Sequence, residues 1–139
     1  MFIYLIECEN GKYYVGKTTD CEHRFKQHCN NKGSIWTRLH KPLRIIDVFE
    51  TEDGFDEDKY TKKFMNKYGI DNVRGGSYTN IVLSKSIKSL LRKELMTAND
   101  LCYCCGSSSH FAKECGLKKM GMLGWLYRQL IFWFGIHQA

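Results

Sequence analysis

The chain has 139 residues, a length that allows one compact domain with an appendage. Apolar residues make up 43% of it and proline occurs once, a composition that excludes a disordered tail. The formal net charge of +6 at pH 7 favours a polyanionic partner.

The N-terminal segment predicts a β-hairpin. Residues 2–8 alternate and are rich in Ile, Leu, Phe and Tyr, and residues 13–16 read Tyr-Tyr-Val-Gly. Residues 9–12, Glu-Asn-Gly-Lys, form a strong hairpin signal between them. No basic flank and no small-residue cleavage site accompany the first apolar residues, so we expect an intracellular protein that is not secreted.

The register of this hairpin decides which side chains share a face. A two-residue Asn10-Gly11 loop would place Tyr4 and Tyr14 on opposite faces. A three-residue loop over 9–11, built as a type I turn closed by Gly11 in the left-handed region, places both tyrosines on one face. We favour the second register because it also leaves one largely apolar face to bury.

A helix is predicted next, over residues 19–31. Thr19 and Glu22 have the spacing of a capping box at its start. Arg24 and His28 are four residues apart within it. Their side chains therefore project from the same face of the helix.

A third strand over residues 43–50 and a second helix over residues 53–68 follow, and Gly69 is placed to end that helix. Glu57 lies on or beside the apolar stripe of this helix. A carboxylate in that position needs a partner, and a metal ion would be one. The stripe consists of Tyr60, Phe64 and Tyr68.

A Gly-rich loop after Asn72 leads to a third helix, predicted over residues 84–96, and to a short link. We therefore divide the chain into a domain over 1–96, a metal-binding motif over 102–115 and an apolar, amphipathic tail over 117–139. The tail is shorter than a comfortable membrane span and carries a central arginine. The tail could pack on the domain, on a partner protein, on a second copy or on a membrane surface.

The hairpin resembles the motif that names the GIY-YIG nucleases, through Ile3-Tyr4 and Tyr14-Val15-Gly16. Phe2 stands where the family has its first Gly, and Val15 replaces an Ile. The resemblance covers roughly residues 1–83. The family's remaining residues follow in order, as an R-x-x-x-H pair on a helix, a glutamate on a later helix and an asparagine: Arg24, His28, Glu57 and Asn72.

The resemblance implies an α/β fold, a small three-stranded antiparallel sheet flanked by helices, and a metal-dependent endonuclease that cuts DNA. Arg24 would stabilise the transition-state phosphate, and His28 would donate to that phosphate or relay a proton. Tyr4 and Tyr14 would position or deprotonate the attacking water. Glu57 would hold a single Mg²⁺ ion, or Mn²⁺ in its place. Its neighbours Asp56 and Asp58 are alternatives for that position.

Further residues are candidates for substrate binding. Lys17 follows Tyr-Val-Gly as in the excision-repair subunits of this family and would touch phosphate, and Asn72 would order its loop or contact the site. The DNA could be single-stranded or branched, and RNA stays open. Other possible functions are a non-catalytic nucleic-acid-binding scaffold and a membrane-associated adaptor. Trp36, Thr37 and Arg38 are candidates to extend the binding surface, with a core position as the alternative for Trp36.

The segment 102–115 has the pattern C-x2-C-x4-H-x4-C, which suits tetrahedral Zn²⁺. It resembles a CCHC zinc knuckle, a module that binds single-stranded nucleic acid by stacking bases on an aromatic ring. Tyr103 is the candidate stacking platform, and a protein-binding role is the alternative. The odd number of cysteines in the chain, seven, argues for a reducing compartment. The ligands would be Cys102, Cys105, His110 and Cys115.

Overall fold

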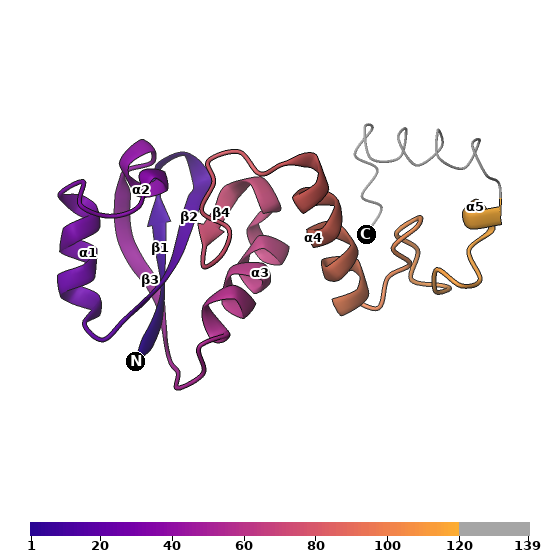
Figure 1. Cartoon of the computed structure of the whole chain (residues 1–139), viewed down its shortest axis with the longest axis horizontal. Helices are drawn as coiled ribbons and strands as arrows, with labels where there is room; N and C mark the ends of the chain where they lie inside the picture. The colour runs from indigo at the N-terminus through magenta and orange to yellow at the C-terminus, as the bar shows by residue number, and fades with distance from the viewer. Residues whose placement is uncertain (120–139) are drawn as a thin grey trace. The chain divides into compact units, whose positions relative to one another are not determined.

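The computed structural model describes residues 1–119 (Figure 1). It contains two compact units, one formed by residues 1–88 and a second that begins at Ser89. The predicted apolar tail falls almost entirely outside the described residues. Within residues 1–119, no helix has the length and apolar character needed to cross a membrane.

The first unit is built on a mixed sheet with the strand order β3-β1-β2-β4. The predicted antiparallel strands are all present, as β1 (Phe2–Cys8), β2 (Lys12–Thr18) and β3 (Pro42–Glu50). A short strand that the sequence analysis missed, β4 (Val73–Gly75), pairs in parallel with β2. So short a segment, ending in glycines, carries too little alternation to reveal a strand.

The favoured register of the hairpin is confirmed. Tyr4 lies opposite Gly16 and Ile6 lies opposite Tyr14, so both tyrosines share one face of the sheet. The rings of Tyr4 and Tyr14 are 6.4 Å apart between centroids.

The turn itself differs from the type I turn that we predicted. Asn10 and Gly11 both adopt left-handed conformations, with φ of 60° and 65°. Asparagine tolerates this region better than most residues, which makes the turn possible. The Glu9 amide donates to the Lys41 carbonyl at 2.9 Å, outside the hairpin. This bond connects the turn to the segment before β3, in the register with the three-residue loop.

Helices cover both faces of the sheet, which confirms the expectation of a sheet flanked by helices (Figure 1). On one face, α1 (Cys21–Cys29) and α2 (Ile35–Leu39) pack against Tyr4, Ile6 and Tyr14 through residues such as Trp36. On the other face lies α3 (Asp56–Tyr68). Its tyrosines stack on rings of the sheet, Tyr60 on Phe49 and Tyr68 on Tyr13.

The start of α1 corrects one detail of the sequence analysis. Its N-cap is Asp20, whose carboxylate accepts from the His23 amide at 2.9 Å. The predicted capping box of Thr19 and Glu22 is therefore wrong, because Glu22 instead forms an ion pair with Lys26 one turn later. Both Asp and Thr are favoured N-caps, so their adjacency left the choice to tertiary context.

The helix ends are otherwise close to expectation. Gly69 ends α3 with φ of 98°, and the 3₁₀ turn η2 (Ile70–Asn72) leads into β4. The expected third helix is present as α4 (Lys85–Ala98). In contrast, α2 was missed because a helix this short shows no period.

The second unit contains most of α4, an irregular segment over 102–115 and the short helix α5 (Gly116–Lys119). The Leu101 amide donates to the Met96 carbonyl at 2.8 Å and closes the end of α4. The Gly106 amide donates to the Cys102 carbonyl at 2.6 Å, and Gly106 has φ of 77°. A tight turn therefore follows the first cysteines of the segment.

Candidate active site and metal centre

The candidate catalytic residues come together from four different elements of the first unit. The Tyr14 and His28 rings are 4.9 Å apart between centroids, and Tyr4 lies beside both. The positive charge of Arg24 acts on both tyrosine hydroxyls and opposes the rise in their pKa. The charge of Glu57 acts on the same two hydroxyls. The structure thus gathers all the residues to which we assigned a catalytic role.

A chain of buried hydrogen bonds runs through this site. The Tyr4 hydroxyl lies 2.9 Å from Nε2 of His28, and Nδ1 of His28 lies 2.8 Å from the Thr37 hydroxyl oxygen. The Thr37 hydroxyl donates to the Ser34 carbonyl at 3.0 Å. Trp36 is buried, in the core position given as its alternative, and Thr37 is buried too, whereas Arg38 is exposed. The sequence analysis assigned Ser34 no role.

Burial sets the protonation states of these groups. It raises the pKa of Tyr4 and of Tyr14 above the usual value of about 10, and the Glu57 charge adds to both rises while Arg24 opposes them. Burial, and then the positive charge of Arg24, lower the pKa of His28 to about 4. At neutral pH both phenols are protonated and the imidazole is neutral.

Two glycines make room for these side chains. A Cβ atom at Gly16 would lie 2.3 Å from the Tyr4 hydroxyl oxygen, and one at Gly33 would lie 2.0 Å from Nδ1 of His28. Neither contact is sterically possible without displacing the ring. The glycine of the Tyr-Val-Gly motif is therefore required by the close approach of Tyr4 from the neighbouring strand.

The carboxylates on either side of Glu57 are engaged within the fold, which favours Glu57 as the metal ligand. Asp56 accepts from a threonine hydroxyl and forms an ion pair with Lys59 at 2.7 Å. Asp58 accepts from the Ser77 amide at 2.6 Å and from the Ser77 hydroxyl at 2.7 Å. Within residues 1–119, no hydrogen bond or ion pair engages the Glu57 carboxylate. A partly buried carboxylate free to bind fits a hard divalent cation.

The predicted substrate-binding residues lie in different settings. Lys17 is opposite Ile3 in the hairpin, on the face away from Tyr14. Asn72 accepts from Nζ of Lys12 at 2.8 Å and donates to a backbone carbonyl at the end of α3 at 2.8 Å. Both ends of the Asn72 amide thus serve the fold, which supports the loop-ordering alternative.

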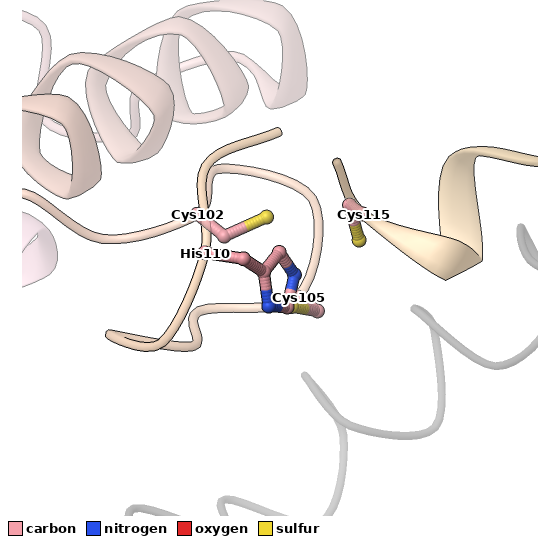
Figure 2. A group of neighbouring side chains, drawn as sticks. All are labelled: Cys102, Cys105, His110 and Cys115. Carbon is pink, nitrogen blue, oxygen red and sulfur yellow. The ribbon is translucent and has the colours of Figure 1, made fainter. Parts of the chain in front are cut away.

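The cysteine and histidine side chains of the second unit form a candidate metal centre (Figure 2). Their ligand atoms all lie within 4.8 Å of one another, and Sγ of Cys105 is 3.3 Å from Nε2 of His110. The hydrogen bond with His110 lowers the pKa of Cys115 to about 6. Three thiols and one imidazole gathered in this way fit tetrahedral Zn²⁺. Its members are Cys102, Cys105, His110 and Cys115.

Aromatic rings stand exposed near this centre. Tyr103 is 38% exposed and Phe111 is 62% exposed. Nζ of Lys93, on α4, lies 4.7 Å from the centre of the Tyr103 ring. The predicted stacking platform is therefore accessible to solvent and carries a cation beside it.

Comparisons with known proteins agree with the geometry. The family model of the GIY-YIG catalytic domain matches residues 1–70. A UPF0213 protein of Halalkalibacterium halodurans is 31% identical over 84 residues, which cover 57% of this chain and 89% of that relative.

Other relatives match a shorter stretch. UPF0213 proteins of Cupriavidus pinatubonensis and Cupriavidus necator are 49% and 42% identical over 45 residues, or 32% of this chain. This chain spans about half the length of those two relatives, 50% and 49%. No solved structure gives a significant match.

Proposed function

The chain belongs to the GIY-YIG catalytic-domain family, and from this premise we propose that it is a metal-dependent endonuclease that hydrolyses DNA phosphodiester bonds. The single observation that carries the proposal is the convergence of two tyrosines, an arginine, a histidine and a glutamate in one partly buried site, the glutamate having no hydrogen bond or ion pair to its carboxylate among residues 1–119. This combination offers charge neutralisation, water orientation and metal binding together.

Arg24 supplies positive charge to the phosphate. Its guanidinium donates to the Gln27 side chain at 2.6 Å, which orients it on α1 while leaving other donors free. Next to the buried tyrosines its charge is poorly screened, and it would stabilise the extra negative charge of the transition state.

The tyrosines orient the attacking water. Because the pKa values of Tyr4 and Tyr14 are raised, both phenols are neutral near pH 7 and act as hydrogen-bonding groups. Either tyrosine can take a proton from the water only as a phenolate, and a nearby cation is needed to favour that form.

Glu57 is the residue that would hold Mg²⁺ or Mn²⁺ in this site. When bound, such an ion supplies Lewis-acid stabilisation of the phosphate and lowers the pKa of bound water. A single carboxylate completed by waters and substrate phosphate is an ordinary Mg²⁺ environment.

The second unit would bind Zn²⁺ as a CCHC knuckle and help to hold nucleic acid. So small a segment has no core of its own, so the metal would supply its folding free energy. Exposed Tyr103 beside Lys93 suits a base of single-stranded or branched DNA, because stacking and a nearby cation favour the same ligand.

Cleavage of supercoiled plasmid and branched DNA, with Mg²⁺, Mn²⁺ or EDTA, tests the proposal. Glu57→Gln should reduce metal-dependent cleavage at least about a hundredfold, while DNA binding measured by fluorescence anisotropy stays nearly unchanged. The matched control is Glu22→Gln, since Glu22 is an exposed glutamate that pairs with Lys26 on α1. Tyr4→Phe and Arg24→Ala should also lose cleavage. Normal cutting by Glu57→Gln would refute the metal assignment.

A non-catalytic nucleic-acid-binding scaffold is the second candidate function. Phe2 at the position of the family's first glycine favours it, since glycine permits close approach of a substrate. Tight DNA binding without cleavage, across these metals and substrates, would establish this second function in place of the first.

A further inference from the structure

We propose that Thr37 is a positioning residue of the active site, which holds His28 in one tautomer and, through His28, fixes the direction of the Tyr4 hydroxyl. The structural part of this inference stands on the geometry of the hydrogen bonds. Its consequence for catalysis rests on the proposed endonuclease function.

The Thr37 hydroxyl has one hydrogen, and its surroundings determine where that hydrogen points. The Ser34 carbonyl, 3.0 Å away, can only accept, and the Ser34 hydroxyl, 3.2 Å away, can donate to the Thr37 oxygen. Once the Thr37 hydroxyl donates there, its oxygen is an acceptor for Nδ1 of His28 at 2.8 Å. Nδ1 must then carry the imidazole hydrogen.

The other ring nitrogen follows from this choice. A neutral imidazole with hydrogen on Nδ1 has a bare Nε2, which accepts the phenol hydrogen of Tyr4 at 2.9 Å. The phenol hydrogen therefore points at His28. The oxygen lone pairs of Tyr4 are left to accept from a donor, such as the Arg24 guanidinium or a water beside it.

The opposite tautomer leaves a polar hydrogen without an acceptor. Nε2–H would donate to Tyr4, and the phenol hydrogen would need another partner. Within residues 1–119, His28 is the hydrogen-bond partner of the Tyr4 hydroxyl, and the guanidinium of Arg24, whose charge acts on that hydroxyl, can only donate. Only the tautomer with Nδ1–H satisfies the whole chain of groups.

Burial makes the Thr37 hydroxyl hard to replace. His28 is 0% exposed and Thr37 is 1% exposed, so bulk water does not reach the bond between them. A side chain of the same shape without a hydroxyl would leave Nδ1–H buried and unpaired. Without Thr37, each tautomer leaves one buried hydrogen unpaired, Nδ1–H in one and the Tyr4 phenol hydrogen in the other, so neither tautomer is enforced.

Long-range ¹H–¹⁵N NMR of the imidazole side chains, on the full zinc-loaded chain near pH 7 without Mg²⁺, tests the tautomer. The His28 signals are assigned by their loss in His28→Gln. We expect the wild type to show hydrogen on Nδ1 alone and Thr37→Ser to match it, while Thr37→Val shows a mixture of the two tautomers. Wild-type hydrogen on Nε2, or hydrogen on Nδ1 alone in Thr37→Val, would overturn the proposal.

Thr61→Val is the matched control for this measurement. Thr61 is also 0% exposed and its hydroxyl also donates to a backbone carbonyl, that of Glu57, at 2.8 Å. It contacts none of the groups in the Tyr4–His28–Thr37 chain, so its removal should leave the His28 signals in place. If Thr37→Val does not fold, the wild-type tautomer alone still decides the assignment.

Steady-state cleavage kinetics test the consequence. Thr37→Val should lose about tenfold or more in kcat with little change in KM, and Thr37→Ser should recover most of it. Wild-type rates in Thr37→Val, with cleavage otherwise intact, would refute the positioning role and leave the nuclease function standing. A wild-type protein that binds DNA but never cuts it would refute the nuclease function, and the NMR result would still decide the tautomer.

Discussion

At the scale of single residues, the candidate active site depends on how closely side chains can approach. Gly16 lies opposite Tyr4 in the hairpin, and the tyrosine hydroxyl occupies the space where a side chain would begin. The position of Tyr4 against His28 follows from this absence. Any larger residue at position 16 would force the Tyr4 side chain into a different position.

Gly16→Ala should therefore displace Tyr4, because the added Cβ would lie 2.3 Å from its hydroxyl oxygen. We expect the free energy of unfolding in urea to fall by about 1–3 kcal/mol, with a loss of cleavage. Gly54→Ala is the comparison, since nothing lies within 4 Å of a Cβ atom at that position. Equal stability of the two variants would contradict this account of Gly16.

His28 makes the stability of the fold depend on pH. Its pKa is about 4 in the folded chain and 6.5 in an unfolded one, so between these values the unfolded chain binds more protons. The free energy of unfolding should thus fall by up to about 3 kcal/mol as the pH is lowered from 6.5 to 4. Urea titrations across this range should show a shallower dependence for His28→Gln, and parallel curves would count against it.

At the scale of elements, adjacent carboxylates at the start of α3 have different roles. Asp58 binds the backbone and side chain of Ser77, and so ties the loop after β4 to the helix. Glu57, one residue earlier, leaves its carboxylate unengaged within residues 1–119. One turn of helix thereby holds a loop in place and offers a ligand to a metal ion.

Asp58→Ala and Glu57→Gln should therefore have opposite effects. Asp58→Ala removes the acceptor for Ser77 and should lower the free energy of unfolding by about 1–3 kcal/mol, while metal-dependent cleavage at low temperature persists. Glu57→Gln should lose cleavage and keep its stability. Urea unfolding and plasmid cleavage on both variants distinguish them, and loss of cleavage in Asp58→Ala with full stability would reassign the metal ligand.

At the scale of the whole molecule, the chain combines two units with different sources of stability. Residues 1–88 have a sheet buried on both faces, whereas the 102–115 segment collects cysteines around a candidate zinc centre. The first unit is stabilised mainly by apolar burial, and we propose that the second depends on metal binding.

Cys105→Ser should therefore abolish zinc binding and unfold the 102–115 segment, while the NMR spectrum of residues 1–88 stays unchanged. Cys104→Ser is the matched control, because Cys104 is not a member of the candidate metal centre and should leave the zinc content intact. Zinc content measured by mass spectrometry decides the matter. Full zinc occupancy in Cys105→Ser would remove that residue from the site.

The features of this protein that could be predicted from its sequence are those that depend on local periodicity and spacing. Strand alternation and the short loop set the hairpin register, so Tyr4 and Tyr14 could be placed on one face. Helical spacing placed Arg24 and His28 on one side of α1. Ligand spacing alone indicated the candidate zinc centre.

Contacts between distant parts of the chain became visible only in the tertiary structure. Tyr4 and His28 are separated by 24 positions, and no local pattern showed that they meet or that Thr37 lies behind them. The added strand β4, whose partner is fixed by long-range pairing, was equally invisible. The choice between Glu57 and Asp58 likewise depended on Ser77, 19 residues from Asp58. Such contacts depend on how the folded elements pack, which the period of any one segment does not encode.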